Sequence, residues 1–129
     1  MGYDARLEGD MLTDGIERII QEIVPGKQIT LAHVIANPDA VLYQKLGLDP
    51  TMDYAKSAIG IITMTPSETA IIAADIAIKA SGIGIGSVDR FNGTLIVTGT
   101  VSQVEAGVVA IVDYCRDKLK FTICDITKT

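Results

Sequence analysis

The pattern of apolar and polar residues changes its period several times along the chain, and each period predicts a different element. Residues 27–35 alternate with a period of two, which is typical of a β-strand. Residues 58–64 form an almost continuous apolar run of strand length, which predicts a central strand. The first strand is expected to place Ile29, Leu31, His33 and Ile35 on one face and Gln28, Thr30, Ala32 and Val34 on the other.

Helices are predicted where capping residues precede apolar residues spaced three and four apart. Asn37-Pro38 is expected to open a short helix over residues 40–46, which Gly47 ends before a loop over residues 48–54. The sequence Thr-Pro-Ser-Glu at residues 65–68 has the pattern of a capping box. It predicts a helix from residue 66 to about residue 80 that is buried on more than one side.

A second capping-box pattern, Ser102 with Glu105, predicts a helix that runs to about Leu119. Its apolar stripe is expected to face a core and consists of Val101, Val104, Val108, Ile111 and Cys115.

The remaining strands follow from alternation and from turn residues. Residues 82–86 alternate glycine with isoleucine, which predicts a strand with one bare face that another backbone can approach closely. The Asn-Gly pair of residues 89–93 predicts a turn that joins this strand to residues 94–97 as a hairpin. With a last strand over residues 120–126, the order strand, helix, strand, helix, strand, strand, helix, strand predicts a layered α+β domain.

The start of the chain differs from the rest. Residues 1–15 combine scattered charges and glycines without sustained periodicity, and we expect them to be a flexible tail that precedes one domain over residues 16–129. Within residues 16–23, the isoleucines have helical spacing, so this pattern alone predicts a short amphipathic helix.

Composition narrows the possible partners. The 11 basic and 16 acidic residues give a net charge of -5, which disfavours nucleic acid as a partner. No apolar run reaches the length that spans a bilayer, so no membrane partner is expected. The two cysteines suggest no disulfide framework and fit a reducing cytoplasm. Since 48% of the residues are hydrophobic and only 5% aromatic, the apolar surplus favours an oligomer.

Candidate chemistry is sparse. His33 could act as a base, but its apolar neighbours on the strand favour a structural, hydrogen-bonded role. The glycines of residues 82–86 lie inside a strand instead of turning a strand into a helix, so they do not form a dinucleotide-binding loop. Asp75 and Lys79 are expected to form an i, i+4 pair. As the only cation on a mostly apolar helix, Lys79 is expected at a seam between subunits.

Three long segments resemble a known family. They are IIQEIVPGKQITLAHVIANPDAVLYQKLGL, SAIGIITMTPSETAIIAADIAIKASGIGIGSVDRFNGTLIVTG and FTICDITKT, which together span most of residues 19–129. They resemble the circularly permuted, single-domain shell proteins of bacterial microcompartments, of the propanediol- and ethanolamine-utilisation type. The resemblance implies a ferredoxin-like α+β domain whose terminal strand and helix, here residues 28–46, have moved to the front.

The same resemblance implies an assembly and a set of site residues. Six copies would form a hexagonal tile that meets other tiles, other shell proteins and enclosed enzymes, in the bacterial cytoplasm. Lys79 matches the tile-edge lysine of the family, and a turn matches its pore loop, formed by Asp89, Arg90, Phe91, Asn92 and Gly93. One strand per subunit would build a β-barrel over the pore, and its residues would be Glu17, Arg18, Ile19, Ile20, Gln21, Glu22 and Ile23.

For residues 16–23, the strand that the resemblance implies is favoured over the helix, because so short a helix is marginal in water. Some relatives bind an iron-sulfur cluster through a cysteine of the pore loop, but residues 89–93 contain none, so no cofactor and no metal are expected. The leading hypothesis is a non-catalytic shell subunit that limits the passage of small molecules. The alternatives are a regulatory domain that binds a small ligand between subunits and, less favoured, an enzyme that uses His33.

Overall fold

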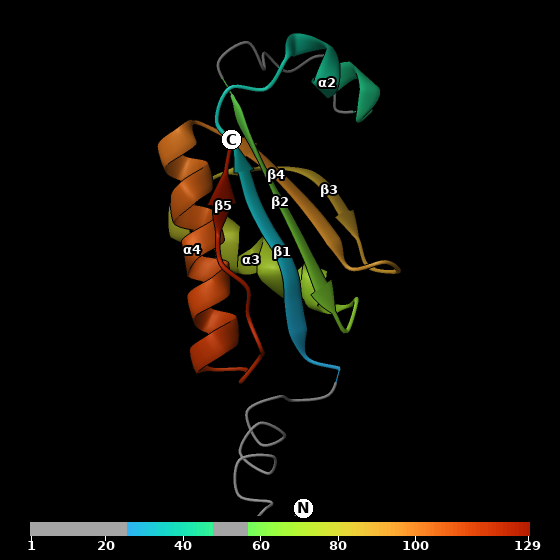
Figure 1. Cartoon of the computed structure of the whole chain (residues 1–129), viewed down its shortest axis with the longest axis vertical. Coiled ribbons are helices and arrows are strands. Elements are labelled where there is room, and N and C mark those ends of the chain that lie inside the picture. The colour runs from blue at the N-terminus through green and yellow to red at the C-terminus, as the bar shows by residue number, and fades with distance from the viewer. Residues whose placement is uncertain (1–25, 48–56) are drawn as a thin grey trace, which may run out of the picture.

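Five strands and three helices, in the order predicted from the sequence, make up the part of the chain that the computed structural model describes, residues 26–47 and 57–129. Their bounds are β1 (Gln28–Ile35), α2 (Ala40–Lys45), β2 (Ala58–Thr65), α3 (Thr69–Ser81), β3 (Gly84–Asp89), β4 (Thr94–Gly99), α4 (Val101–Asp117) and β5 (Thr127–Lys128). The strands form one sheet in the order β3-β4-β2-β1-β5 (Figure 1). Neighbouring strands are antiparallel except β1 and β5, which are parallel. The sheet confirms the predicted central position of residues 58–64.

Helices α3 and α4 pack on one face of this sheet and enclose the main core (Figure 1). The predicted stripe of α4 is confirmed, because Val104, Val108, Ile111 and Cys115 are fully buried and Val101 packs against them. Helix α4 approaches the sheet closely at Gly60, where a Cβ atom would lie 2.8 Å from a methyl group of Val97 and 2.9 Å from one of Val104. The absence of a side chain at Gly60 therefore sets the spacing between helix and sheet.

The opposite face of the sheet is covered at one end by α2 (Figure 1). Tyr43 of α2 is buried there against Ile59, and its hydroxyl donates a hydrogen bond to the carbonyl of Ser57. Further along the same face Leu31 is exposed, and the hydroxyl groups of Thr30 and Thr63 lie 2.7 Å apart. The two faces of the sheet are therefore covered very differently.

Each predicted helix is present, but the capping residues predicted for the helices are wrong. Asp39, not Asn37, caps α2, because its side chain accepts a hydrogen bond from the amide of Val41 at 2.9 Å. Thr100 with Gln103, not Ser102 with Glu105, forms the capping box of α4. The capping box predicted at residues 65–68 does not form.

The reason lies in the neighbouring strand. Thr65 is the last residue of β2 and pairs with Gln28, so it extends the ladder instead of capping a helix. Residues 66–68 make a turn, and α3 begins at Thr69 without a side-chain cap. The helix ends at Gly82, whose φ of 65° is the left-handed conformation that glycine favours at such a position.

Two strand predictions are wrong in register. A β-bulge between Ile29 and Leu31 turns Ile29 into the core beside Ala32 and Val34, away from the face predicted for it. A second register shift, between Ile85 and Ser87, interrupts the glycine-isoleucine alternation of β3.

The last strand is also displaced from its prediction. Residues 120–126 make only an isolated bridge between Thr122 and Gln28, and the strand itself is Thr127–Lys128. The tail of residues 1–15, the segment of residues 16–23 and the loop of residues 48–54 lie outside the described residues.

Candidate functional site

The turn over residues 89–93 is the first of the predicted sites. It joins β3 to β4 as the predicted hairpin, and Asp89 organises it from within. One carboxylate oxygen accepts hydrogen bonds from the amides of Phe91 at 2.9 Å and Asn92 at 3.0 Å, and the other accepts from the side-chain amide of Asn92 at 2.8 Å. The bonds from Asn92, followed by the one from Phe91, lower the pKa of Asp89.

Gly93 fastens this turn to the central strand. Its amide donates to the carbonyl of Asp89 and its carbonyl accepts from the amide of Met64, both at 2.8 Å. A Cβ atom at Gly93 would lie 2.1 Å from the carbonyl oxygen of Met64, and the φ of 78° also disfavours a side chain. The turn is therefore held both by its own carboxylate and by the backbone of β2.

The two remaining side chains of the turn face solvent. Phe91 is 78% exposed, and the guanidinium carbon of Arg90 lies 4.8 Å from the centroid of its ring. This distance is within the range of a cation-π contact. Among the described residues, Arg90 forms no ion pair. The turn thus has a cation that lies over an exposed aromatic ring and has no ion-pair partner in residues 26–47 and 57–129.

Lys79 lies on α3 and confirms the predicted i, i+4 pair. Its ammonium nitrogen is 2.8 Å from a carboxylate oxygen of Asp75, and the two side chains are 75% and 60% exposed. Hydrogen bonding and charge attraction from Asp75 raise the pKa of Lys79. Ser67, just before α3, approaches Gly93, whereas Lys79 lies in the last turn of α3. The structure therefore places the turn and Lys79 at opposite ends of this helix.

The single chain leaves much of α3 uncovered. Its buried residues are Thr69, Ala70, Ala73, Ala74 and Ala77. Ile71, Ile72 and Ile78 remain 52%, 46% and 47% exposed. Burial on more than one side, as predicted, is therefore not reached within one subunit.

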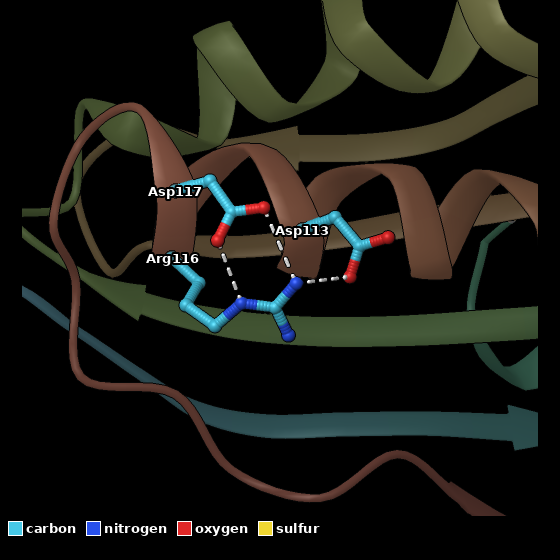
Figure 2. Close-up of polar contacts among 3 residues, drawn as sticks. All are labelled: Asp113, Arg116 and Asp117. Carbon is cyan, nitrogen blue, oxygen red and sulfur yellow. Dashed lines mark hydrogen bonds and ion pairs between the residues drawn. The ribbon is translucent and has the colours of Figure 1, made fainter.

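Charged residues on α4 form a surface network. Arg116 lies 2.8 Å from Asp117 and 3.1 Å from Asp113, and all three side chains are about half exposed (Figure 2). Glu105 pairs with Lys128 at 2.9 Å. Such exposed ion pairs contribute little to stability individually.

His33 has the structural role predicted for it. One ring nitrogen lies 2.5 Å from the hydroxyl of Thr127 and the other lies 2.9 Å from that of Thr129. The imidazole therefore joins β1 to the last residues of the chain, and within the described residues no carboxylate contacts it.

Two further features bear on function. Across residues 26–47 and 57–129, no three histidine, cysteine, aspartate or glutamate side chains gather where they could hold a metal ion. None of the described helices has the length and apolar character needed to cross a membrane.

Sequence reasoning missed two features of these sites. It placed both Asp89 and Arg90 in the pore loop without a distinction between them, whereas the carboxylate of Asp89 is hydrogen-bonded within the turn. The local pattern of aspartate followed by Asn-Gly could have indicated this, because aspartate often accepts bonds from amides two and three residues later. It also missed the exposure of the isoleucines of α3, which no local pattern reveals. The proposed barrel residues Glu17, Arg18, Ile19, Ile20, Gln21, Glu22 and Ile23 lie outside the described residues.

Comparisons with known proteins agree on one family. Residues 58–125 match the family model described as the BMC domain. The bacterial microcompartment shell protein PduU of Salmonella typhimurium is 51% identical over 113 residues, which cover 88% of this chain and 94% of the relative. The shell protein EutS of the same organism is 50% identical over 88% of this chain and 97% of its own length.

A solved structure gives the same result. The structure described as the CutR flat hexamer, form 1, has a TM-score of 0.75 and 40% identity, and the match covers 98% of this chain and all of that one. The relatives are named as shell proteins, in agreement with the prediction of a structural and non-catalytic role. The resemblance inferred from the sequence is confirmed: this chain belongs to the bacterial microcompartment shell proteins.

Proposed function

We propose that six copies of this chain form a flat shell tile and that the 89–93 turn of each copy borders a central pore. The observation that carries the proposal is the likeness of almost the whole chain to a relative whose structure is a flat hexamer. The tile would be a building block of a microcompartment shell in the bacterial cytoplasm. Its pore would limit the passage of small molecules.

The surface of α3 supports assembly with further copies. Ile71, Ile72 and Ile78 are each about half exposed in the single chain, although the other side of the same helix is buried against the core. Exposed apolar side chains gathered on one helix are typical of a contact surface between subunits. Burial by neighbouring copies would give α3 the second covered side that its sequence predicts.

Circular permutation accounts for the position of β1. The family model matches only residues 58–125, yet β1 precedes this region and lies within the same sheet, between β2 and β5. The amide of Ile29 donates to the carbonyl of Thr122, so the start of β1 adjoins the end of the matched region. If residues 28–46 have moved from the end of the domain to its front, the start of β1 is expected to lie beside the end of the matched region.

The geometry also supports a barrel over the pore. The start of β1 lies at the end of the sheet that holds the 89–93 turn, because Ile29 pairs with Met64 and Met64 bonds to Gly93. Only residues 24–27 separate residues 16–23 from β1 in the sequence. A strand formed by these residues in each subunit would therefore start beside the turn that we place at the pore, and residues 1–15 would extend beyond it as a flexible tail.

Lys79 is proposed as a contact between tiles. It is highly exposed, its charge is maintained by Asp75, and its neighbour Ile78 offers apolar surface at the same end of α3. Such an edge would meet other tiles of the same kind, other shell proteins of the compartment, or both. Enclosed enzymes would be the partners of the inner face.

Electron microscopy of the purified protein, combined with light scattering, tests the central proposal. We expect hexagonal particles with the mass of six subunits, and extended sheets at high protein concentration. A protein that remains monomeric at millimolar concentration would contradict the proposal. A stable dimer whose melting temperature rises with a small ligand would instead support a regulatory domain.

A further inference from the structure

The two charged side chains of the 89–93 turn are not equivalent. Both carboxylate oxygens of Asp89 already accept hydrogen bonds from Phe91 and Asn92. Arg90 has no carboxylate partner among the described residues. Within the part of the chain that the structure describes, the guanidinium is therefore the charged group of this turn that has no hydrogen-bond or ion-pair partner, and its donors can contact a molecule that approaches the turn.

The contact with Phe91 places the guanidinium group over an exposed ring. The guanidinium carbon lies 4.8 Å from the centroid of that ring. The N–H donors lie along the edge of the guanidinium plane, and they match the paired oxygens of a carboxylate or a phosphate. Stacking on a ring also restricts the long side chain, which reduces the conformational entropy that is lost when a ligand binds.

We propose that Arg90, stacked on Phe91, is a binding site for small solutes that carry a carboxylate or phosphate group. This inference rests on the proposed function, because six copies of the turn around one pore would bring six such guanidinium groups together. Rings of arginine are suited to anion selectivity. The solutes that bind to the turns around the pore would therefore be small organic acids or phosphate esters, and neutral polyols would bind more weakly.

Nearby negative charges limit how the site works. For a solute that is still far from the turn, the negative charge of Asp89 offsets the positive charge of Arg90. A second carboxylate, Glu68, is also near, because it follows Ser67, which adjoins Gly93. Glu68 accepts a hydrogen bond from Ser67 at 3.0 Å and is exposed. The preference for anions therefore depends on direct contact with the N–H donors of Arg90 and not on a positive field around the pore.

Calorimetric titration of the purified protein with sodium succinate, and with glycerol as the neutral comparison, tests the proposal. We expect succinate to bind the wild-type protein in the millimolar range and glycerol to give no saturable signal. Arg90→Gln should weaken succinate binding by about tenfold or more, the effect expected when a charged hydrogen-bond donor is lost. Arg90→Lys should bind with intermediate strength, because lysine keeps the charge but lacks the planar fork.

Lys45→Gln provides the matched control, since it removes an exposed cation from α2, away from the turn, and should leave binding unchanged. The absence of succinate binding to wild-type protein, or equal binding to Arg90→Gln, would overturn the inference. Particles imaged from the same samples distinguish the two proposals. Hexamers without succinate binding would refute this inference alone, whereas a protein that forms no hexamers would refute the proposed function.

Discussion

Single residues determine the shape of the 89–93 turn. Gly93 combines a positive φ with a position directly against the carbonyl oxygen of Met64. Asp89 supplies the acceptors for the amides inside the turn. The turn therefore depends on two residues whose effects on stability can be separated by substitution.

Gly93→Ala is expected to destabilise the protein by at least about 3 kcal/mol, because backbone strain adds to a clash that only a backbone shift relieves. Gly47→Ala is the matched control. Its φ of 70° is similar to that of Gly93, but among the described residues beyond its chain neighbours no atom lies within 4 Å of the added Cβ atom. It should cost only about 1 to 2 kcal/mol. Urea denaturation at one fixed protein concentration measures both changes, and equal losses would contradict the role assigned to the Met64 carbonyl.

The hydrogen bonds to Asp89 predict a specific response to acid. They lower its pKa in the folded state, so the folded protein binds this proton less readily than the unfolded chain. The stabilisation is therefore complete above the ordinary aspartate pKa and is lost as the pH falls through the lowered one. NMR titration should show the amide signals of Phe91 and Asn92 moving only below the ordinary aspartate pKa.

Asp89→Asn should remove this titration while the hairpin persists. A transition of the wild-type amides at or above the ordinary aspartate pKa would show that the carboxylate is not held as described.

At the scale of elements, the sequence predicts which helices and strands exist better than where they begin. The apolar stripe of α4 follows from spacing alone, since it depends only on residues within the helix. Its cap does not, because Thr100 and Ser102 both precede suitable partners and the choice depends on where β4 ends. Thr65 was likewise assigned to a cap although pairing with Gln28 retains it in β2.

The strand errors have the same physical origin. The bulge that turns Ile29 into the core depends on pairing with β2, more than 30 residues away. The position of β5 depends on His33, whose imidazole bonds to Thr127 and Thr129. Contacts between residues far apart in sequence set these registers, and local periodicity does not contain them.

The choice of cap in α4 can be tested directly. Thr100→Ala removes an acceptor that bonds to the amide of Gln103 at 3.1 Å, and it should destabilise the protein by about 1 kcal/mol. Ser102→Ala makes the same kind of change two residues later, at an exposed helical position, and should have an effect within about 0.5 kcal/mol. Thermal unfolding at equal protein concentration measures the difference, and the reverse order of effects would contradict the observed capping box.

At the scale of the whole molecule, the order of the elements and the family were both predicted from the sequence, because long ordered segments carry the resemblance. The chemistry of the candidate pore loop was predicted only in part. Its five residues are assigned from the family resemblance and stay a prediction, and the state of each of its charges depends on hydrogen bonds between side chain and backbone. The contacts of α3 with other copies lie beyond what one chain determines.

Lys79→Ala tests the proposed edge between tiles. The exposed pair with Asp75 contributes little to stability, so the subunit should fold and form hexamers as before. Extended sheets should be lost in electron micrographs, because the contact between neighbouring tiles is removed. Lys45→Ala, which removes an exposed lysine from α2, should still form sheets. Sheets of Lys79→Ala that match the wild type would refute the assignment.

The attachment of Gly93 to Met64 has a consequence for how the turn can move. Because a backbone hydrogen bond from the amide of Met64 joins the turn to the central strand, the turn cannot swing aside as a lid does over microseconds to seconds. The parts of the turn that are free to move quickly are exposed side chains such as Arg90, which change rotamer within picoseconds to nanoseconds. A pore bordered by this turn would then stay open at all times. Its width would be an average over the fast side-chain motions, and it would not switch between open and closed states.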